Sequence, residues 1–88
     1  MKEKEMERVL KALANKRRLA ILRFIKKKKE ATVGEITEEI RLSFKSVSKH
    51  LAVLAGADIL EREQKSLQVF YRLSGNPSEG ARRIIELL

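Results

Sequence analysis

The chain opens with an apolar stripe of helical spacing. Its members stand at positions i, i+3, i+4 and i+7, namely Met6, Val9, Leu10 and Leu13. This period predicts a helix over residues 4–14, one face of which must be covered by other parts of the protein.

A second, more central helix is predicted after Asn15, because asparagine is a favoured N-cap residue. Its apolar positions are Leu19, Leu22 and Ile25 on one face, widened toward full burial by Ala20, Ile21 and Phe24. We expect this helix to end within the lysine run of residues 26–29, before Ala31.

A short third helix is predicted to begin at a capping box. Thr32 and Glu35 have the spacing of such a box. The Thr32 hydroxyl can accept the backbone N–H of Glu35, and the Glu35 carboxylate can accept the backbone N–H of Thr32. Ile36 and Ile40 then form the core face of this helix.

The fourth helix has two contrasting faces. Ser43 is interpreted first as its N-cap, and the helix runs to about Ala55. Val47, Leu51 and Leu54 fall on one inward seam. The period therefore turns small polar and cationic residues outward: Lys45, Ser46, Ser48, Lys49 and Ala52.

After Gly56 the apolar period changes to two, which is typical of β-strands. Residues 59–64 and 69–73 are predicted to pair as a hairpin. Its turn near Lys65 and Ser66 lacks the glycine that tight hairpins favour, so the strand register stays open.

A last helix is predicted with Asn76 as its cap, Pro77 at the first helical position and Glu79 completing a capping box. Its apolar stripe is Ala81, Ile84, Ile85 and Leu88. Together the elements predict a single domain over residues 1–88, mainly α with a small β-hairpin wing. This order, ααααββα, is that of a winged helix-turn-helix.

The composition limits how such a fold can be stabilised. With 88 residues, 43% of them apolar and only three Phe, one Tyr and no Trp, the chain can bury a thin and mostly aliphatic core. We therefore expect a partner subunit to add stability, as a homodimer. The residues predicted to meet the partner are those of the two terminal stripes: Met6, Val9, Leu10, Leu13, Ala81, Ile84, Ile85 and Leu88.

The charge of the chain is basic and unevenly spread. Twenty Lys and Arg against twelve Asp and Glu give +8, which favours polyanions such as DNA, RNA or anionic lipid. Residues 15–30 hold eight cations and one Glu (+7), whereas residues 31–42 hold one Arg and three Glu (−2). The lysine run has two interpretations: a solvated helix end that the helix dipole favours, or a phosphate contact.

Residue content excludes several kinds of site. Without cysteine there are no disulfides, thiolate metal sites or cysteine nucleophiles, and His50 alone cannot build a zinc site. No Ser/His/Asp set, converging carboxylates or glycine-rich phosphate loop indicates an enzyme. With neither an apolar signal region nor a membrane-length apolar run, we expect a cytoplasmic protein without metal or cofactor.

The outward face of the fourth helix is the candidate for reading double-stranded DNA. Lys45 and Lys49 can reach guanine acceptors or phosphates. Ser46, Ser48 and His50 are short hydrogen-bonding groups suited to base edges. The size of the helix suits the major groove.

Further candidates flank that face, some with two interpretations. Arg62 and Lys65 of the wing are expected to touch phosphate or the minor groove. Phe44 is either an apolar lid over the core or a contact to a thymine methyl. His50 is either a histidine at the edge of the core, bonded to backbone, or a DNA contact.

Several segments of the chain carry motifs of a known family. They are residues 13–22 (Leu-Ala-Asn-Lys-Arg-Arg-Leu-Ala-Ile-Leu), 33–36 (Val-Gly-Glu-Ile), 42–43 (Leu-Ser), 47–51 (Val-Ser-Lys-His-Leu) and 69–73 (Val-Phe-Tyr-Arg-Leu). The chain resembles the ArsR family of prokaryotic winged-helix repressors over roughly residues 6–74. This resemblance implies a homodimer, with its first and last helices at the interface, that binds a two-fold operator.

The chain departs from that family where a metal would bind. Metal-sensing members carry Cys-Val-Cys in the third helix, where this sequence has Thr-Val-Gly at residues 32–34, and the last helix has no His or Asp. A response to arsenic, zinc or cadmium is therefore not implied. Phe44 and Asp58 stand where the family often has a polar residue and a glycine.

Two other functions fit fewer residues. A winged helix can serve as a protein-interaction module, but here its reading face carries Lys45 and Lys49 and no acid before Asp58. A basic amphipathic helix over residues 17–29 could bind anionic lipid, but its apolar residues are needed for the core. We favour a DNA-binding transcription regulator, acting as a repressor, whose operator and effector the sequence leaves open.

Overall fold

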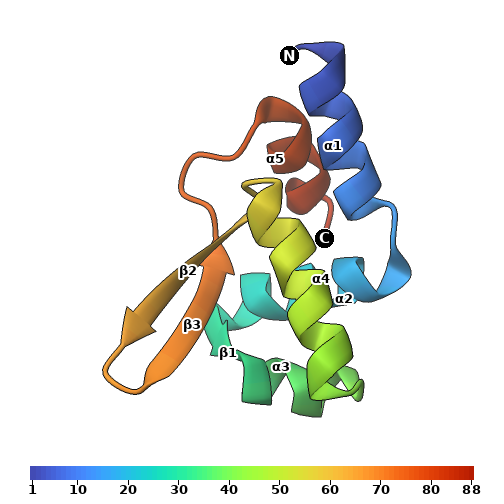
Figure 1. Ribbon diagram of the computed structural model, residues 1–88. Coiled ribbons are helices and arrows are strands. Elements are labelled where there is room, and N and C mark those ends of the chain that lie inside the picture. Colours follow the sequence, from blue (N-terminus) through green and yellow to red (C-terminus); the bar gives the residue numbers. More distant parts are fainter.

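Five helices and a three-stranded sheet make up the computed structural model, which describes all 88 residues (Figure 1). Along the chain the elements are α1 (Glu3–Leu13), α2 (Lys16–Lys28), β1 (Glu30–Thr32), α3 (Val33–Ile40), α4 (Phe44–Gly56), β2 (Leu60–Lys65), β3 (Gln68–Leu73) and α5 (Glu79–Glu86). The predicted winged helix-turn-helix is confirmed, with one strand, β1, added between the second and third helices.

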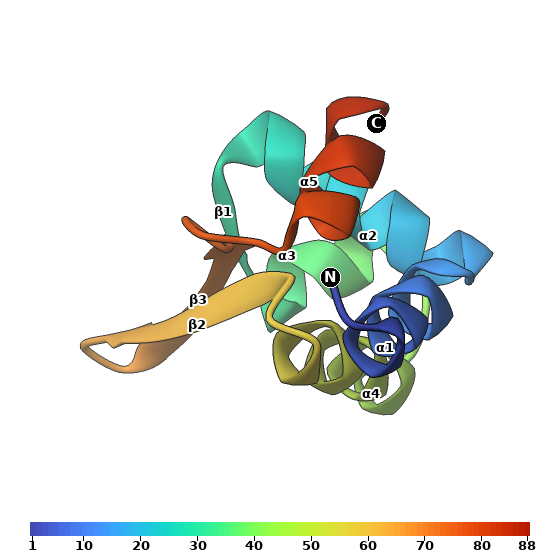
Figure 2. The same ribbon diagram turned by 90° about the horizontal axis from the view of Figure 1, so that it is seen from above.

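The three middle helices contact one another, and the other elements are arranged around them. In Figure 1 α2 lies behind α4 and α3 lies at the lower end of the molecule. The hairpin of β2 and β3 projects to one side as the wing, whereas α1 and α5 lie side by side away from the wing tip (Figures 1 and 2). The wing tip and the terminal helices thus lie at opposite ends of the molecule.

The core is aliphatic and centres on α2. Ile21, Leu22 and Ile25 of α2 have no exposed surface. The other large, fully buried side chains are Ile36 of α3, Val47, Leu51 and Leu54 of α4, and Ile59 before β2. No polar or charged residue is buried, so the core depends on apolar packing alone. The inward seam predicted for the fourth helix is confirmed.

One side of α2 is open, against expectation. The sequence predicts Ala20 within the buried face, but Ala20 is exposed and Phe24 is only half-buried. Because an α-helix turns about 100° per residue, Ala20 lies about 200° around the axis from the buried Leu22. α3 covers that side of α2 only in part, since both helices line a groove there.

β1 is a strand that the sequence pattern does not reveal. It pairs antiparallel with β3, with Ala31 opposite Tyr71, in a sheet of order β1-β3-β2. Three residues are too few to display a period of two. The strand also follows directly on the lysine run, where the pattern predicts the end of a helix.

The wing closes with a two-residue turn. Lys65 stands opposite Gln68, so Ser66 and Leu67 make the turn. Ser66 has φ 58°, the left-handed conformation that a tight hairpin turn requires and that glycine usually supplies. The register that the sequence leaves open is thus that of a two-residue turn, with a serine rather than a glycine in the left-handed region.

Three predicted helix caps are present. The side-chain oxygen of Asn15 accepts two backbone N–H groups of α2, at 3.0 and 3.1 Å. Thr32 and Glu35 make the reciprocal capping box of α3. The hydroxyl of Ser43 accepts the N–H of Ser46 at 3.1 Å, so the start of α4 is fixed locally.

The predicted start of the last helix is wrong. α5 begins at Glu79, and its cap is Ser78, whose hydroxyl accepts the N–H of Ala81 at 3.3 Å. Asn76 is exposed and Pro77 precedes the helix. Asparagine and serine are both good caps, and the choice between them depends on where packing against the core places the first turn of α5.

α1 and α5 cover much of their own apolar stripes. Val9 and Leu13 of α1 and Ala81 and Ile85 of α5 are at most 9% exposed. These four residues are already covered within the chain, so they have little surface left for the partner subunit that the sequence predicts. The rest of the two stripes remains at least partly accessible: Met6, Leu10, Ile84 and Leu88.

The end of α5 is fastened to α2. The ammonium group of Lys26 donates to the carbonyl oxygens of Ile85 and Leu88 at 2.9 and 2.8 Å. A cation at a helix C-terminus also interacts favourably with the helix dipole. One member of the lysine run therefore holds the last helix in place.

We expect Ser78→Ala to lower the free energy of unfolding by about 1 kcal/mol, because the Ala81 N–H loses its acceptor. Asn76→Ala is the matched control and should leave stability unchanged. Urea unfolding followed by circular dichroism measures both. A larger loss for Asn76→Ala would show that the helix is capped at the earlier residue.

Candidate nucleic-acid interface

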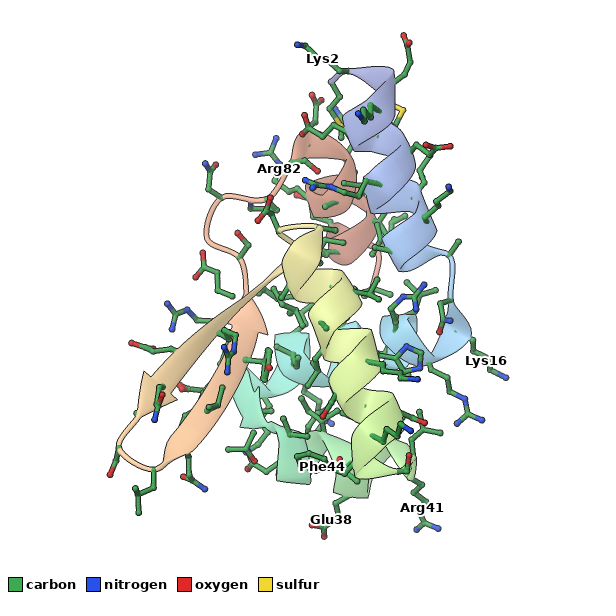
Figure 3. All side chains as sticks on the ribbon, viewed as in Figure 1. Lys2, Lys16, Glu38, Arg41, Phe44 and Arg82 are labelled. Atoms are coloured by element: carbon green, nitrogen blue, oxygen red, sulfur yellow. The ribbon has the colours of Figure 1, made fainter.

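The exposed face of α4 is built by the seam on its other side. Val47, Leu51 and Leu54 are completely buried, which fixes the rotation of the helix about its axis. The opposite face is left with Lys45, Lys49 and Ala52 exposed and with Ser46 and Ser48 half-buried. Figure 3 shows Phe44 at the free end of this helix, with Arg41 and Glu38 close by.

Two cations on this face have no partner within the chain. The side chains of Lys45 and Lys49 make no ion pair and no hydrogen bond, whereas Lys11, Lys28 and Lys65 are each paired with a carboxylate. An unpaired, solvated ammonium can bind a phosphate or a guanine edge without first breaking an internal bond.

The two serines differ in how free they are. The hydroxyl of Ser46 accepts a hydrogen bond from the Ser43 hydroxyl at 3.1 Å, so it is partly engaged in the cap of α4. Ser48 makes no side-chain hydrogen bond and lines a groove of about 470 Å³ between α4 and the wing. Ser48 is therefore the hydroxyl more available for a base edge.

Phe44 is 64% exposed, so its interpretation as a lid over the core is wrong. The half-buried Ile40 and Leu42 pack against the core near this end of α4, and the seam is filled without the phenyl ring. The interpretation that stays open is a contact with a thymine methyl, because an exposed aromatic ring at the start of a reading helix can meet that group.

His50 is tied to Arg18 of α2. The guanidinium lies 3.3 Å from Nδ1 of His50 and also donates to the carbonyl oxygens of Lys11 and Ala12 at the end of α1. Because an arginine can only donate, Nδ1 accepts and the proton of the neutral ring sits on Nε2. His50 is thus bonded to a side chain rather than to backbone, and its contact with DNA stays a prediction.

Burial lowers the pKa of His50 below its ordinary 6.5, and the charges of Arg18 and Arg17 lower it further. The neutral imidazole is therefore the form that suits the folded protein near neutral pH. Arg18 links three helices, since it lies on α2 and contacts α1 and α4.

The wing offers less free positive charge than its composition predicts. Lys65 is held by both carboxylate oxygens of Glu30 at 2.8 Å and lies 5.1 Å from the centre of the Phe70 ring. A phosphate contact by Lys65 would have to replace this pair. Arg72 is bound by Glu61 and Glu63 across the strands.

Arg62 is the free cation of the wing, exposed and without an ion pair. It stands opposite Tyr71 in the hairpin and lines the groove shared with Ser48. Gln68 and Tyr71 line the same groove, although the sequence pattern does not single them out. The signal that could have found them is the strand register, which sets Tyr71 opposite Arg62 and Gln68 opposite Lys65.

Known proteins with this arrangement are transcription regulators. A helix-turn-helix domain family model matches residues 13–63, more than half of the chain. A homodimeric winged helix-turn-helix DNA-binding domain from Mycobacterium bovis, a possible ArsR-family transcriptional regulator, superposes with a TM-score of 0.82 at 30% identity, covering 96% of this chain and 74% of that one. The chain belongs to the ArsR family of winged helix-turn-helix transcription regulators.

Two further relatives in the ArsR-like group are similar over most of the chain. The transcriptional activator HlyU of Vibrio cholerae is 39% identical over 80 residues, which are 91% of this chain and 70% of the relative. Its structure superposes with a TM-score of 0.82, covering 99% of this chain and 92% of that chain. The transcriptional repressor PagR of Bacillus anthracis is 32% identical over 80 residues, 91% of this chain and 77% of the relative.

This ArsR-family domain therefore presents α4 as the second helix of its helix-turn-helix, with the wing beside it. Relatives named as activator and as repressor share the fold, so the fold alone does not set the direction of regulation. None of the five helices combines the length and the apolar character that a membrane span requires.

The lowered pKa of His50 predicts a loss of stability on acidification. The unfolded chain takes up a proton near the ordinary pKa of 6.5, before the folded protein does, so the free energy of unfolding should fall as the pH drops below about 6.5 and be flat above it. His50 is the only histidine. His50→Gln should therefore abolish this slope in urea unfolding measured between about pH 5.5 and 7.5; a slope that persists would belong to another group.

Proposed function

We propose that this chain is a homodimeric, cytoplasmic repressor that binds a specific double-stranded DNA sequence by placing α4 in the major groove. The observation that carries the proposal is the face of α4, where two unpaired lysines and a free serine hydroxyl stand on a helix whose rotation is fixed by the core. Membership of a family of DNA-binding regulators supports it.

The two parts of the interface would have different roles. Lys45, Ser48 and Lys49 face the base edges and adjoining phosphates, where they contribute to sequence choice. Arg62 of the wing contacts the phosphate backbone, which positions the domain without reading sequence. Lys65 has a smaller role, because Glu30 already neutralises it.

We expect Ser48→Ala to cost about 1 kcal/mol, or roughly fivefold in affinity, on a preferred site and little on a scrambled duplex. Arg62→Ala should weaken binding to both duplexes. It should also flatten the slope of log affinity against log salt concentration by about one unit, because the variant neutralises one phosphate fewer and so releases fewer counterions. Lys65→Ala should change the slope less than Arg62→Ala does. Binding to duplexes selected from random sequence, measured across salt concentrations, gives all three values.

Arg82→Ala is the control, because Arg82 is an exposed cation of α5 far along the chain from the reading helix. It should match the wild type. If Ser48→Ala and Arg62→Ala behave alike, the assignment of α4 to reading is wrong. If the wild type shows no salt-dependent DNA binding at all, the protein-interaction function takes its place.

Metals are not the effector in this proposal. The chain has no cysteine, and no three His, Asp or Glu side chains are grouped as a metal site would require. The same DNA titrations with EDTA and with zinc should therefore coincide. Repression itself is measured with a reporter gene placed behind the selected site.

The proposed dimer forms through α1 and α5. Met6 and Leu10 of α1 are 44 and 53% exposed, and Leu87 at the end of α5 is 79% exposed. Water-exposed apolar groups on adjoining helices are typical of a surface that another subunit covers. The Mycobacterium bovis domain, which is described as homodimeric, has the same fold and supports this arrangement.

We expect Leu10→Lys to convert the dimer into a monomer in sedimentation experiments at micromolar concentration, because the partner would have to bury an ammonium group. Leu67→Lys is the matched control, since Leu67 is 97% exposed at the wing tip, and it should remain dimeric. A wild type that sediments as a monomer, with or without DNA, would contradict the proposed dimer.

A further inference from the structure

A groove between α2 and α3 is lined by residues that take no part in the proposed DNA contacts of α4 and the wing. It has a volume of about 830 Å³, within the range of small-molecule sites. Its apolar part is formed by Ala20 and Phe24 of α2 and Ile40 of α3. Five cations of α2 surround this part: Lys16, Arg17, Arg23, Lys27 and Lys28.

Four of these cations have no partner. Lys28 is paired with Glu35 at 2.9 Å, whereas the side chains of Lys16, Arg17, Arg23 and Lys27 make no ion pair and no hydrogen bond. Arg23 and Lys27 also stand at i and i+4 on one face of α2, where like charges destabilise a helix. Glu39 is the only acid in the groove, so an anion bound there would relieve the repulsion.

The groove opens on a different side of α2 from the reading helix. Arg18 reaches His50 of α4, and Ala20, two residues later, lies about 200° around the helix. α2 lies behind α4 in Figure 1, and the view from above in Figure 2 shows the two helices next to each other. The uncovered apolar surface also argues against a simple phosphate contact. A polar DNA backbone would not be stabilised by lying on the side chain of Phe24.

We propose that this groove binds a small amphipathic anion, a carboxylate or sulfonate whose acidic head meets Arg23 and Lys27 and whose apolar body lies on Ala20 and Phe24. The groove is walled by α3, the first helix of the helix-turn-helix pair, which packs on α4. A bound anion therefore biases the packing of α3 and changes DNA affinity. This regulatory part rests on the proposed DNA binding; the binding site itself does not.

The test uses 8-anilino-1-naphthalenesulfonate as a fluorescent probe, with decanoate as a competitor and decanol as its uncharged counterpart. The wild type should bind the probe, decanoate should displace it, and decanol at the same concentration should not. Ala20→Phe fills the groove at an exposed position and should weaken probe binding at least tenfold. Lys4→Phe, which adds the same ring elsewhere, should leave probe binding unchanged.

A second pair of variants tests the charges. Arg23→Gln combined with Lys27→Gln should weaken probe and decanoate binding about tenfold, whereas Arg82→Gln should not. Unfolding midpoints confirm that each variant is folded. The monomeric variant Leu10→Lys should bind the probe as the wild type does, which separates the groove from the exposed apolar surface of α1 and α5.

Probe binding that is indifferent to Ala20→Phe and to the double variant would overturn the proposed site. So would a double variant that loses ligand-free DNA binding while probe binding persists, because its cations would then belong to the DNA contact. Decanoate that binds the groove and leaves the affinity for selected DNA unchanged would overturn the regulatory part. Groove binding without any DNA binding would instead contradict the proposed function and leave the site standing.

Discussion

The burial of one aliphatic face of α2 is the interaction on which the rest of the structure depends. Ile21, Leu22 and Ile25 are fully buried, and each contributes about 1.5–3 kcal/mol by the usual scale for a buried aliphatic side chain. α1, α3, α4, β1 and β3 all contact this helix. Because no polar or charged residue is buried, the charged side chains all lie at the surface of the protein.

Much of the fold follows from local sequence signals, and the exceptions have physical reasons. The helices capped by Asn15, Thr32 and Ser43 were predictable because a cap and an apolar period agree there. β1 was not, because its pairing depends on β3, which lies about forty residues further along the chain. The start of α5 and the exposure of Ala20 depend on tertiary packing, which outweighs local preference.

Some features of the candidate site could likewise be predicted from the sequence, and others could not. The outward position of Lys45 and Lys49 follows from the helical period, since Val47, Leu51 and Leu54 must face the core. The neutralisation of Lys65 by Glu30 and the tie between Arg18 and His50 join residues that are 35 and 32 positions apart. No spacing rule reveals such pairs, so the availability of a charge for DNA can be judged only once the fold is known.

The cations of α2 that hold the terminal helices have a consequence for the spacing of an operator. Arg18 binds the last carbonyl groups of α1, and Lys26 binds those of α5. In a dimer joined through α1 and α5, each reading helix is then carried by a rigid arm. One base pair inserted between half-sites shifts them by about 3.4 Å and rotates them by about a tenth of a turn. In the proposed dimer a stiff arm could not absorb that phase error, so the number of base pairs between half-sites would become part of what such a dimer recognises.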